Sequence, residues 1–247
     1  ILLIYSQTKV KNPIISFSVL KNKNFAIGAL MIFTSESAWI AFVFLFCIFT
    51  QSKFAYNYSG SFLTGVYLIP VCLASLIISP ILMIYIAKLN IKWLLLLGNI
   101  LIFSALLILI FSAFRTGYIN IWWRFVILGL GIALSWIFMT PYAMSTIDVK
   151  ESGHASGMFE ICRFLGNAFG ICVADAWLRG TFISNLKLKL PNFDAHAILD
   201  SHFANINHVA VLGGADGKVL HVLQNALIAG YSNGITVCMI LTTLNFV

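Results

Sequence analysis

Residues 61–87, SFLTGVYLIPVCLASLIISPILMIYIA, form an uninterrupted stretch without a single charged side chain. A helix needs about 20 apolar residues to cross the hydrocarbon core of a bilayer, and this stretch exceeds that length. Lipid offers the backbone no hydrogen-bond partner, so a single segment that crosses it must satisfy its own amides as a helix. The stretch therefore predicts a transmembrane helix.

Five further apolar stretches accompany it, at residues 25–51, 94–114, 125–147, 155–178 and 222–247. Over the whole chain, 60% of the residues are hydrophobic and only 9% are charged, whereas about 25% charged residues is typical of soluble domains. We therefore expect an all-α integral membrane protein, a bundle of about six transmembrane helices surrounded by the lipid bilayer.

The polar residues divide the chain into three parts. We expect residues 1–178 to form the membrane bundle, made of the end of one span and five complete spans. Residues 179–221, the one sizeable polar region, are expected to form an extracytoplasmic loop, and residues 222–247 the last span. Both ends of the sequence lie in apolar runs, so we interpret the chain as a fragment of a longer protein.

The lysine residues indicate which side of the membrane each connection occupies. They cluster within residues 7–24 and 88–92, and the positive-inside rule places such connections in the cytoplasm. The net charge of +7 is explained by these short clusters between apolar runs. They lack the interleaved aromatic and basic pattern of a nucleic-acid groove, so we expect no nucleic-acid partner.

No motif for catalysis or metal binding is found. The five cysteines lie inside apolar runs without a close C-x-x-C pair, which argues against a zinc site or a disulfide framework. The sequence has no nucleophile motif, phosphate-binding loop or H-E-x-x-H pattern. We therefore expect no enzyme, no cofactor and no metal.

Glu36 is the charged residue within the first complete span. Charges inside the membrane are costly and mark functional candidates. A lone carboxyl group there is expected to be protonated, because apolar surroundings disfavour the charged form. Two interpretations remain open, coupling to a proton or substrate, and a neutral side chain that is hydrogen-bonded to a neighbouring helix.

Glu160 and Arg163 lie three residues apart in the fifth span, hence on one helix face. Such a pair is interpreted either as a gate that breaks and re-forms or as a structural pair that orients the helix. Asp175 and Arg179, four apart at the end of this span, are expected to pair near water. Arg124 is expected to extend outward beside two tryptophans.

Small residues and prolines mark candidate positions for helix packing and bending. The G-x-x-x-G spacing is typical of close helix contacts, and a proline within a span removes a backbone hydrogen bond and permits a kink or hinge. The candidates are Gly157, Gly166, Gly170, Pro70, Pro80 and Pro141.

Nearly the whole chain resembles the C-terminal half of the fourteen-span drug:proton antiporters of the major facilitator superfamily, the EmrB/QacA type. The most specific stretch is Ala155-Ser156-Gly157 followed by Arg163, Gly166 and Gly170, which is similar to the family pattern A-S-G-(5)-R-x-x-G-(3)-G. Asn12-Pro13, the segment 20–25 and Gly28 resemble the entrance to span nine. Glu160 departs from the family, which usually has a polar uncharged residue there.

The resemblance implies a major facilitator superfamily helical bundle that works by alternating access in a bacterial inner membrane. It implies a small-molecule substrate, export driven by protons, and a periplasmic adaptor protein as a possible partner at the outer loop. Two alternatives stay open, a facilitator for a specific metabolite within the same superfamily and a polytopic scaffold that transports nothing.

Overall fold

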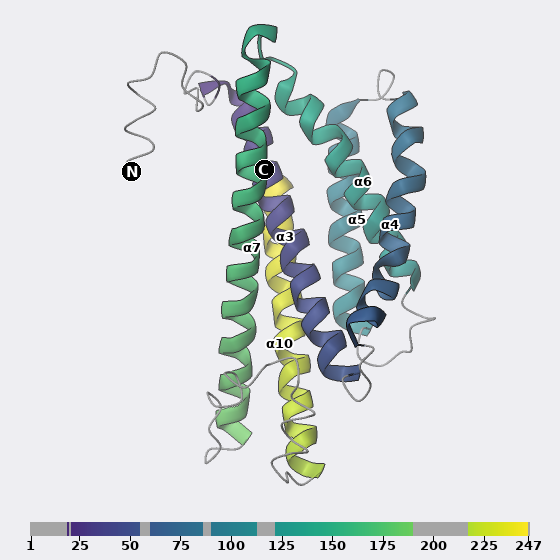
Figure 1. Cartoon of the computed structure of the whole chain (residues 1–247), viewed down its shortest axis with the longest axis vertical. Coiled ribbons are helices and arrows are strands. Elements are labelled where there is room, and N and C mark those ends of the chain that lie inside the picture. The colour runs from purple at the N-terminus through teal and green to yellow at the C-terminus, as the bar shows by residue number, and fades with distance from the viewer. Residues whose placement is uncertain are drawn as a thin grey trace.

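Six long helices run side by side along the long axis of the molecule (Figure 1). In the computed structural model the described residues are 19, 21–54, 60–85, 90–112, 122–189 and 217–246. The helices are α3 (Lys23–Phe54), α4 (Gly60–Tyr85), α5 (Ile91–Ser112), α6 (Trp122–Met144), α7 (Ser152–Lys189) and α10 (Gly217–Thr243), with short 3-10 turns at Val149–Glu151 and Leu244–Phe246. None of the described residues is in a β-strand.

All six helices are long and apolar enough to cross a membrane. The all-α membrane bundle predicted from the sequence is therefore confirmed. Of the expected cytoplasmic segments 7–24 and 88–92, the structure describes residues 19, 21–24 and 90–92, and most of the expected loop 179–221 lies outside the described residues.

Consecutive helices alternate in direction. The starts of α3, α5 and α7 lie at the same end of the bundle as the ends of α4 and α6 (Figure 1). Short connections between antiparallel helices produce this up-and-down order. The order agrees with the alternation of connections from which the sidedness was predicted.

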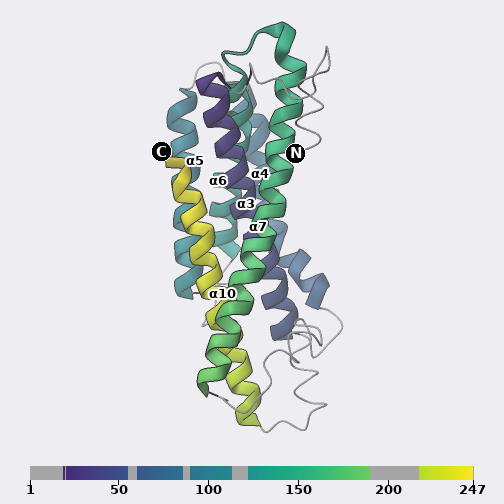
Figure 2. The same ribbon diagram turned by 90° about the vertical axis from the view of Figure 1, so that its left-hand side faces the viewer.

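Helix α3 occupies the centre of the bundle and packs against α4, α6, α7 and α10 (Figures 1 and 2). Its buried face carries aromatic rings. Phe46 lies 5.3 Å from Phe125 of α6, and Phe49 stacks on Tyr231 of α10 at 4.7 Å, both measured between ring centroids. Such ring pairs stabilise a fold by more than the apolar area that they bury. Aromatic contacts with α6 and with α10 therefore help to hold α3 in place.

Helix α4 has two unequal faces. One face packs against α6, where Gly129 lies so close to Val71 and Ala74 that a Cβ atom at this position would overlap them. The rest of α4 is not covered by other helices, and only 11% of the residues in its most hydrophobic part are buried within the protein. The large apolar side chains exposed on α4 are Phe62, Ile69, Leu73, Leu76, Ile77, Ile81, Met83 and Ile84. This much bare apolar surface is what a helix in contact with lipid presents.

Helix α7 is longer than the sequence predicts. The predicted span ended at residue 178, and residues 179 onward were assigned to the outer loop, whereas α7 continues without a break to Lys189. Leu178, Phe182 and Leu186 are each almost fully buried, and their spacing of four residues aligns them on one face. Burial of this face stabilises the additional turns of α7. The lower parts of α7 and α10 project together beyond the other helices (Figure 1). The last helix likewise begins five residues earlier than predicted, at Gly217.

Candidate functional site

Glu36 lies at the centre of the candidate site, on the face of α3 that packs against α7. Its side chain is only 3% exposed, and its Oε1 accepts a hydrogen bond from Nε of Arg163 at 2.7 Å. The expectation of a lone carboxyl group is therefore wrong, because the guanidinium of a different helix supplies a counter-charge. A charge-assisted hydrogen bond of this length is among the stronger polar contacts in proteins.

Glu160 is the second carboxylate of the site. Its Oε1 lies 3.5 Å from Nη1 of Arg163, so the pair predicted on one face of α7 is present. Glu160 is about half exposed, whereas Glu36 is buried. One guanidinium therefore lies between a buried carboxylate on α3 and an accessible carboxylate on its own helix, and we refer to these three residues as the charge cluster.

Trp136 of α6 connects the charge cluster with the interior of the bundle. The guanidinium carbon of Arg163 lies 5.4 Å from the centroid of the Trp136 ring, within the range of a cation–π contact. On its other side Trp136 meets Trp39 of α3 in an edge-to-face contact, with ring centroids 6.3 Å apart. Neither tryptophan was predicted from the sequence to belong to the site. Both lie in the middle of apolar spans, whereas tryptophans of membrane helices are usually found near the membrane surface, and this unusual position could have marked them as candidates.

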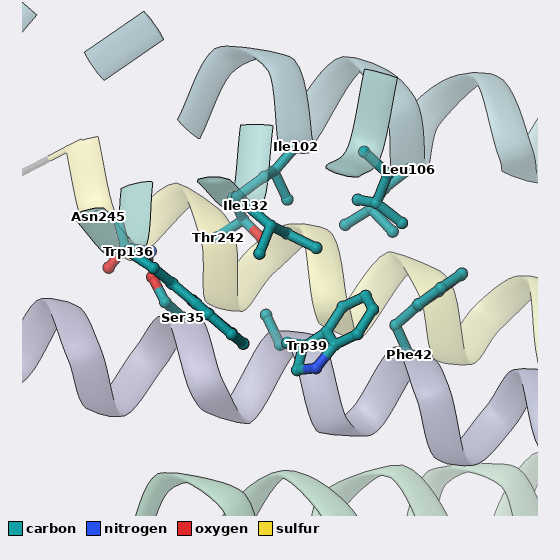
Figure 3. Close-up of a pocket in the computed structure, with 11 residues that line it drawn as sticks. Ser35, Trp39, Phe42, Ile102, Leu106, Ile132, Trp136, Thr242 and Asn245 are labelled. Carbon is teal, nitrogen blue, oxygen red and sulfur yellow. Dashed lines mark hydrogen bonds between the residues drawn. The ribbon is translucent and has the colours of Figure 1, made fainter. Parts of the chain in front are cut away.

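The two tryptophans also form part of the wall of a pocket between α3, α5, α6 and α10 (Figure 3). The pocket is narrow and has room for about one or two water molecules. In Figure 3, Ser35 and Asn245 lie at one end, and Phe42 and Leu106 lie toward the other. The lining residues are Ser35, Ala38, Trp39, Phe42, Ile102, Leu106, Leu128, Ile132, Trp136, Thr242 and Asn245. Its lining, apolar with a few polar groups at one end, has the composition of small-molecule sites, and a drug-sized compound would need the helices around it to move apart.

Asn245, just beyond α10, ties the polar end of the pocket together. Its Nδ2 donates to Oγ of Ser35 at 2.9 Å, and its Oδ1 accepts from the Thr34 hydroxyl. Both partners are on α3, next to Glu36 in the sequence. These buried hydrogen bonds fix the rotation of α3 relative to the end of α10, and thereby the direction in which Glu36 points.

The glycines of α7 differ in their surroundings. Gly166 and Gly170 lie against the backbone of α3 at Phe33 and Ser37, where an added Cβ would overlap main-chain atoms. The Ser37 hydroxyl donates to the carbonyl oxygen of Gly166 at 2.8 Å. By contrast, nothing lies within 4 Å of the position that a Cβ would take at Gly157. The close approach of α3 and α7 thus occurs beside the charge cluster, and Gly157 does not take part in it.

The three candidate hinge prolines lie inside continuous helices. Pro70 and Pro80 are in α4, and Pro141 is in the last turn of α6. Near Pro80 the hydroxyl of Ser79 donates to the carbonyl oxygen of Ser75 at 2.5 Å. This hydrogen bond does not replace the donor that Pro80 lacks, because an α-helical residue 80 would donate to the carbonyl oxygen of Leu76.

The other charged residues of the spans lie apart from the cluster. Arg179 donates through Nε to both carboxylate oxygens of Asp175, at 2.9 and 2.8 Å, as the spacing of four residues predicted. Arg124 was expected to extend outward, but the residue is only 8% exposed. Its guanidinium carbon lies 5.1 Å from the centroid of the neighbouring Trp123 ring. Among the described residues, no group of three histidine, cysteine or acidic side chains could hold a metal ion.

Comparisons with known proteins give a consistent family. The sequence family described as Major Facilitator Superfamily matches residues 4–171. The Multidrug resistance protein Stp of Mycobacterium tuberculosis is 25% identical over 223 residues, which cover 86% of this chain and 40% of that protein. The Colistin resistance protein EmrB of Acinetobacter baumannii is 23% identical over 183 residues, which cover 72% of this chain and 35% of that protein. The chain thus spans about 40% or less of the length of these relatives.

Proposed function

Because this chain belongs to the major facilitator superfamily, we propose that it contributes six helices to a secondary active transporter, which exports drugs or other small amphipathic compounds in exchange for protons. The family match confirms the resemblance predicted from the sequence. The names of the two relatives, which refer to multidrug and colistin resistance, support the proposed direction and substrate class.

The charge cluster is the observation that carries the proton coupling. While Glu36 is ionised, Arg163 binds it at 2.7 Å. When Glu36 takes up a proton, the attraction between the two side chains falls, and Arg163 keeps Glu160 and the ring of Trp136 as partners. The link between α3 and α7 is thereby weakened by one proton, and release of the proton restores it. A bistable contact of this kind is what a proton-driven conformational cycle requires.

The pocket beside the cluster supports an amphipathic substrate. Its walls are mostly apolar and aromatic, and hydroxyl and amide groups lie at one end. Trp136 lines the pocket and also contacts Arg163 of the charge cluster. A compound that displaces this ring also disturbs the contact of Arg163, which gives a physical route from substrate binding to the protonation of Glu36.

Sidedness and partners complete the proposal. We place residues 7–24 and 88–92 in the cytoplasm and residues 179–221 outside, in a bacterial inner membrane. A periplasmic adaptor protein would meet the outer segment. Helix packing at Gly166 and Gly170 and bending at Pro70, Pro80 and Pro141 are proposed to accompany the conformational cycle, whereas Gly157, which meets no neighbouring helix, is left out of this role.

The test is efflux from proteoliposomes with a defined pH gradient, using the longest reading frame that contains this chain. Glu36→Gln and Glu160→Gln are compared with Asp175→Asn, which alters a charged pair outside the cluster. We expect Glu36→Gln to abolish efflux driven by the gradient while substrate exchange without a gradient continues, and Asp175→Asn to transport normally.

The other outcomes distinguish the rival functions. Unchanged gradient-driven efflux in both glutamine variants refutes the coupling role of the cluster. Exchange of one metabolite without any response to the gradient indicates a facilitator. If the protein is folded and no compound exchanges, the transport proposal fails and the scaffold interpretation replaces it.

A further inference from the structure

Arg124, the third residue of α6, is a buried cation outside the charge cluster. The residue is 8% exposed, and neither Nε nor Nη1 has a hydrogen-bond partner within the described structure. Its guanidinium carbon lies 5.1 Å from the centroid of the Trp123 ring. Buried polar groups normally find acceptors, and a charged group that lacks them is costly. Two of the three guanidinium nitrogens of Arg124 therefore lack an acceptor, a need that an anion would meet.

The carboxylates that the structure describes do not fill this need. Glu36 and Glu160 are engaged by Arg163, and Asp175 is engaged by Arg179. The remaining two, Asp148 and Glu151, follow the end of α6, whereas Arg124 is at its start. The 23 residues of this helix separate the two ends by about 33 Å at the usual rise per residue.

The surroundings of Arg124 favour an anion in two further ways. The first turn of a helix exposes amide N–H groups and carries the positive end of the helix dipole. Side chains on a helix point back toward its start, so the guanidinium of Arg124 is directed at this turn. By these rules the guanidinium of Arg124 and the first-turn amides of α6 favour an anion at the same end of the helix, as in the anion sites found at many helix starts.

The two tryptophans at the start of α6 indicate the depth of the site. Trp122 and Trp123 remain 49% and 41% exposed, although both are large and aromatic. Tryptophan is enriched where the membrane meets water, at the level of the lipid headgroups. At that depth the abundant anion is the phosphate of a phospholipid.

We propose that Arg124 and the first turn of α6 bind the phosphate of an anionic phospholipid headgroup at the outer surface of the membrane. The flexible stem of the arginine lets the guanidinium turn toward the headgroup when the lipid is present. Bidentate binding of phosphate is a property of arginine that lysine does not share. The inference does not depend on transport, since it concerns lipid binding at the start of α6, one helical turn before Leu128 of the pocket wall.

The experiment measures lipid binding by the purified protein in detergent. Phosphatidylglycerol is titrated while thermal unfolding is followed, and native mass spectrometry counts the bound lipids. Arg124→Gln is compared with Arg124→Lys and with Lys92→Gln. Lys92 is a matched control, because it is an exposed cation in the first turn of another spanning helix, α5. A galactolipid without phosphate and inorganic phosphate alone serve as further probes.

We expect the wild type and Lys92→Gln to be stabilised by phosphatidylglycerol at the same concentration. Arg124→Gln should need at least about tenfold more lipid, the effect of losing one charged hydrogen bond, and Arg124→Lys should lie between the two. The galactolipid and inorganic phosphate should have no comparable effect.

Three results would overturn the inference. Equal weakening in Lys92→Gln would indicate general attraction between charges. Equal binding of inorganic phosphate would show that the site takes a free anion and not a lipid. If Arg124→Gln does not fold, Arg124→Lys decides the matter, and full retention of lipid affinity in that variant would exclude the bidentate site.

Discussion

Replacing Gly166 or Gly170 by alanine tests the close approach of α3 and α7. At Gly170 an ideal Cβ would lie 2.7 Å from Cγ2 of Ile40 and 2.8 Å from Cα of Ser37, whereas ordinary contacts begin at 3.4 Å. The carbonyl oxygen of Ser37 lies closer still, so the helices must separate by more than about 0.6 Å. Overpacking of this kind costs about 1–3 kcal/mol. At Gly166 the separation also strains the hydrogen bond from Ser37, worth about 1 kcal/mol.

The same helix offers matched controls. At Gly157 and Gly180 nothing lies within 4 Å of the position of an added Cβ, so alanine there should gain up to about 1 kcal/mol from its higher helix propensity. The two pairs of variants should then differ by about 2–3 kcal/mol, or roughly 5–10 °C in the unfolding temperature of a protein of this size. Thermal unfolding of the purified protein in detergent measures this difference. If Gly166→Ala is as stable as Gly157→Ala, then α3 and α7 do not touch as described.

Three further predictions concern the site and the sidedness. Arg163→Met leaves Glu36 buried without its cation and should destabilise the protein by about 2 kcal/mol, below the usual 3–5 kcal/mol because Arg163 is 38% exposed. Adding Glu36→Gln should recover most of that loss in the same unfolding assay. If the two substitutions instead lower the free energy of unfolding additively, the two side chains do not form the ion pair. Asn245→Leu removes the hydrogen bond to Ser35 and should lower the free energy of unfolding by about 1–2 kcal/mol, so an unchanged denaturation midpoint would argue against that contact. An alkaline phosphatase fusion after Asn90 should be inactive, since the enzyme needs an extracytoplasmic location, and activity there would invert the proposed orientation.

The spans could be predicted because hydropathy and length alone determine them. A charge-free run such as 61–87 leaves a helix as the only solution in lipid, and the observed α4 differs from it by one or two residues at each end. The end of α7 was missed because Arg179 and Lys187 lower the hydropathy, although the buried seam at Leu178, Phe182 and Leu186 is visible as a spacing of four. Hydropathy reports contact with lipid, whereas this extension is held by contacts within the protein.

The candidate site was predicted only where its contacts are local. The spacing of Glu160 and Arg163 is sufficient to place them together, since both lie on one helix face. The partner of Glu36 is 127 residues away in the sequence, and no periodicity within a span indicates which helix lies beside it. For the same reason the contact between Trp136 and the guanidinium of Arg163 could not be predicted. Helix order in the bundle decides these contacts, and that order is a property of the assembled fold.

The bare face of α4 has a consequence for the freedom of its sequence. Where Leu76 or Ile84 meets acyl chains, leucine, isoleucine, valine and phenylalanine are nearly interchangeable, since a fluid has no shape to match. At the contact of Val71 and Ala74 with Gly129 there is no spare room, because a single Cβ added at Gly129 would overlap the main chain of Val71. We therefore expect substitutions to accumulate rapidly on the face of α4 that meets lipid and slowly on the face that meets α6. Homologous chains should differ most on the lipid-facing side of α4 while keeping apolar residues there.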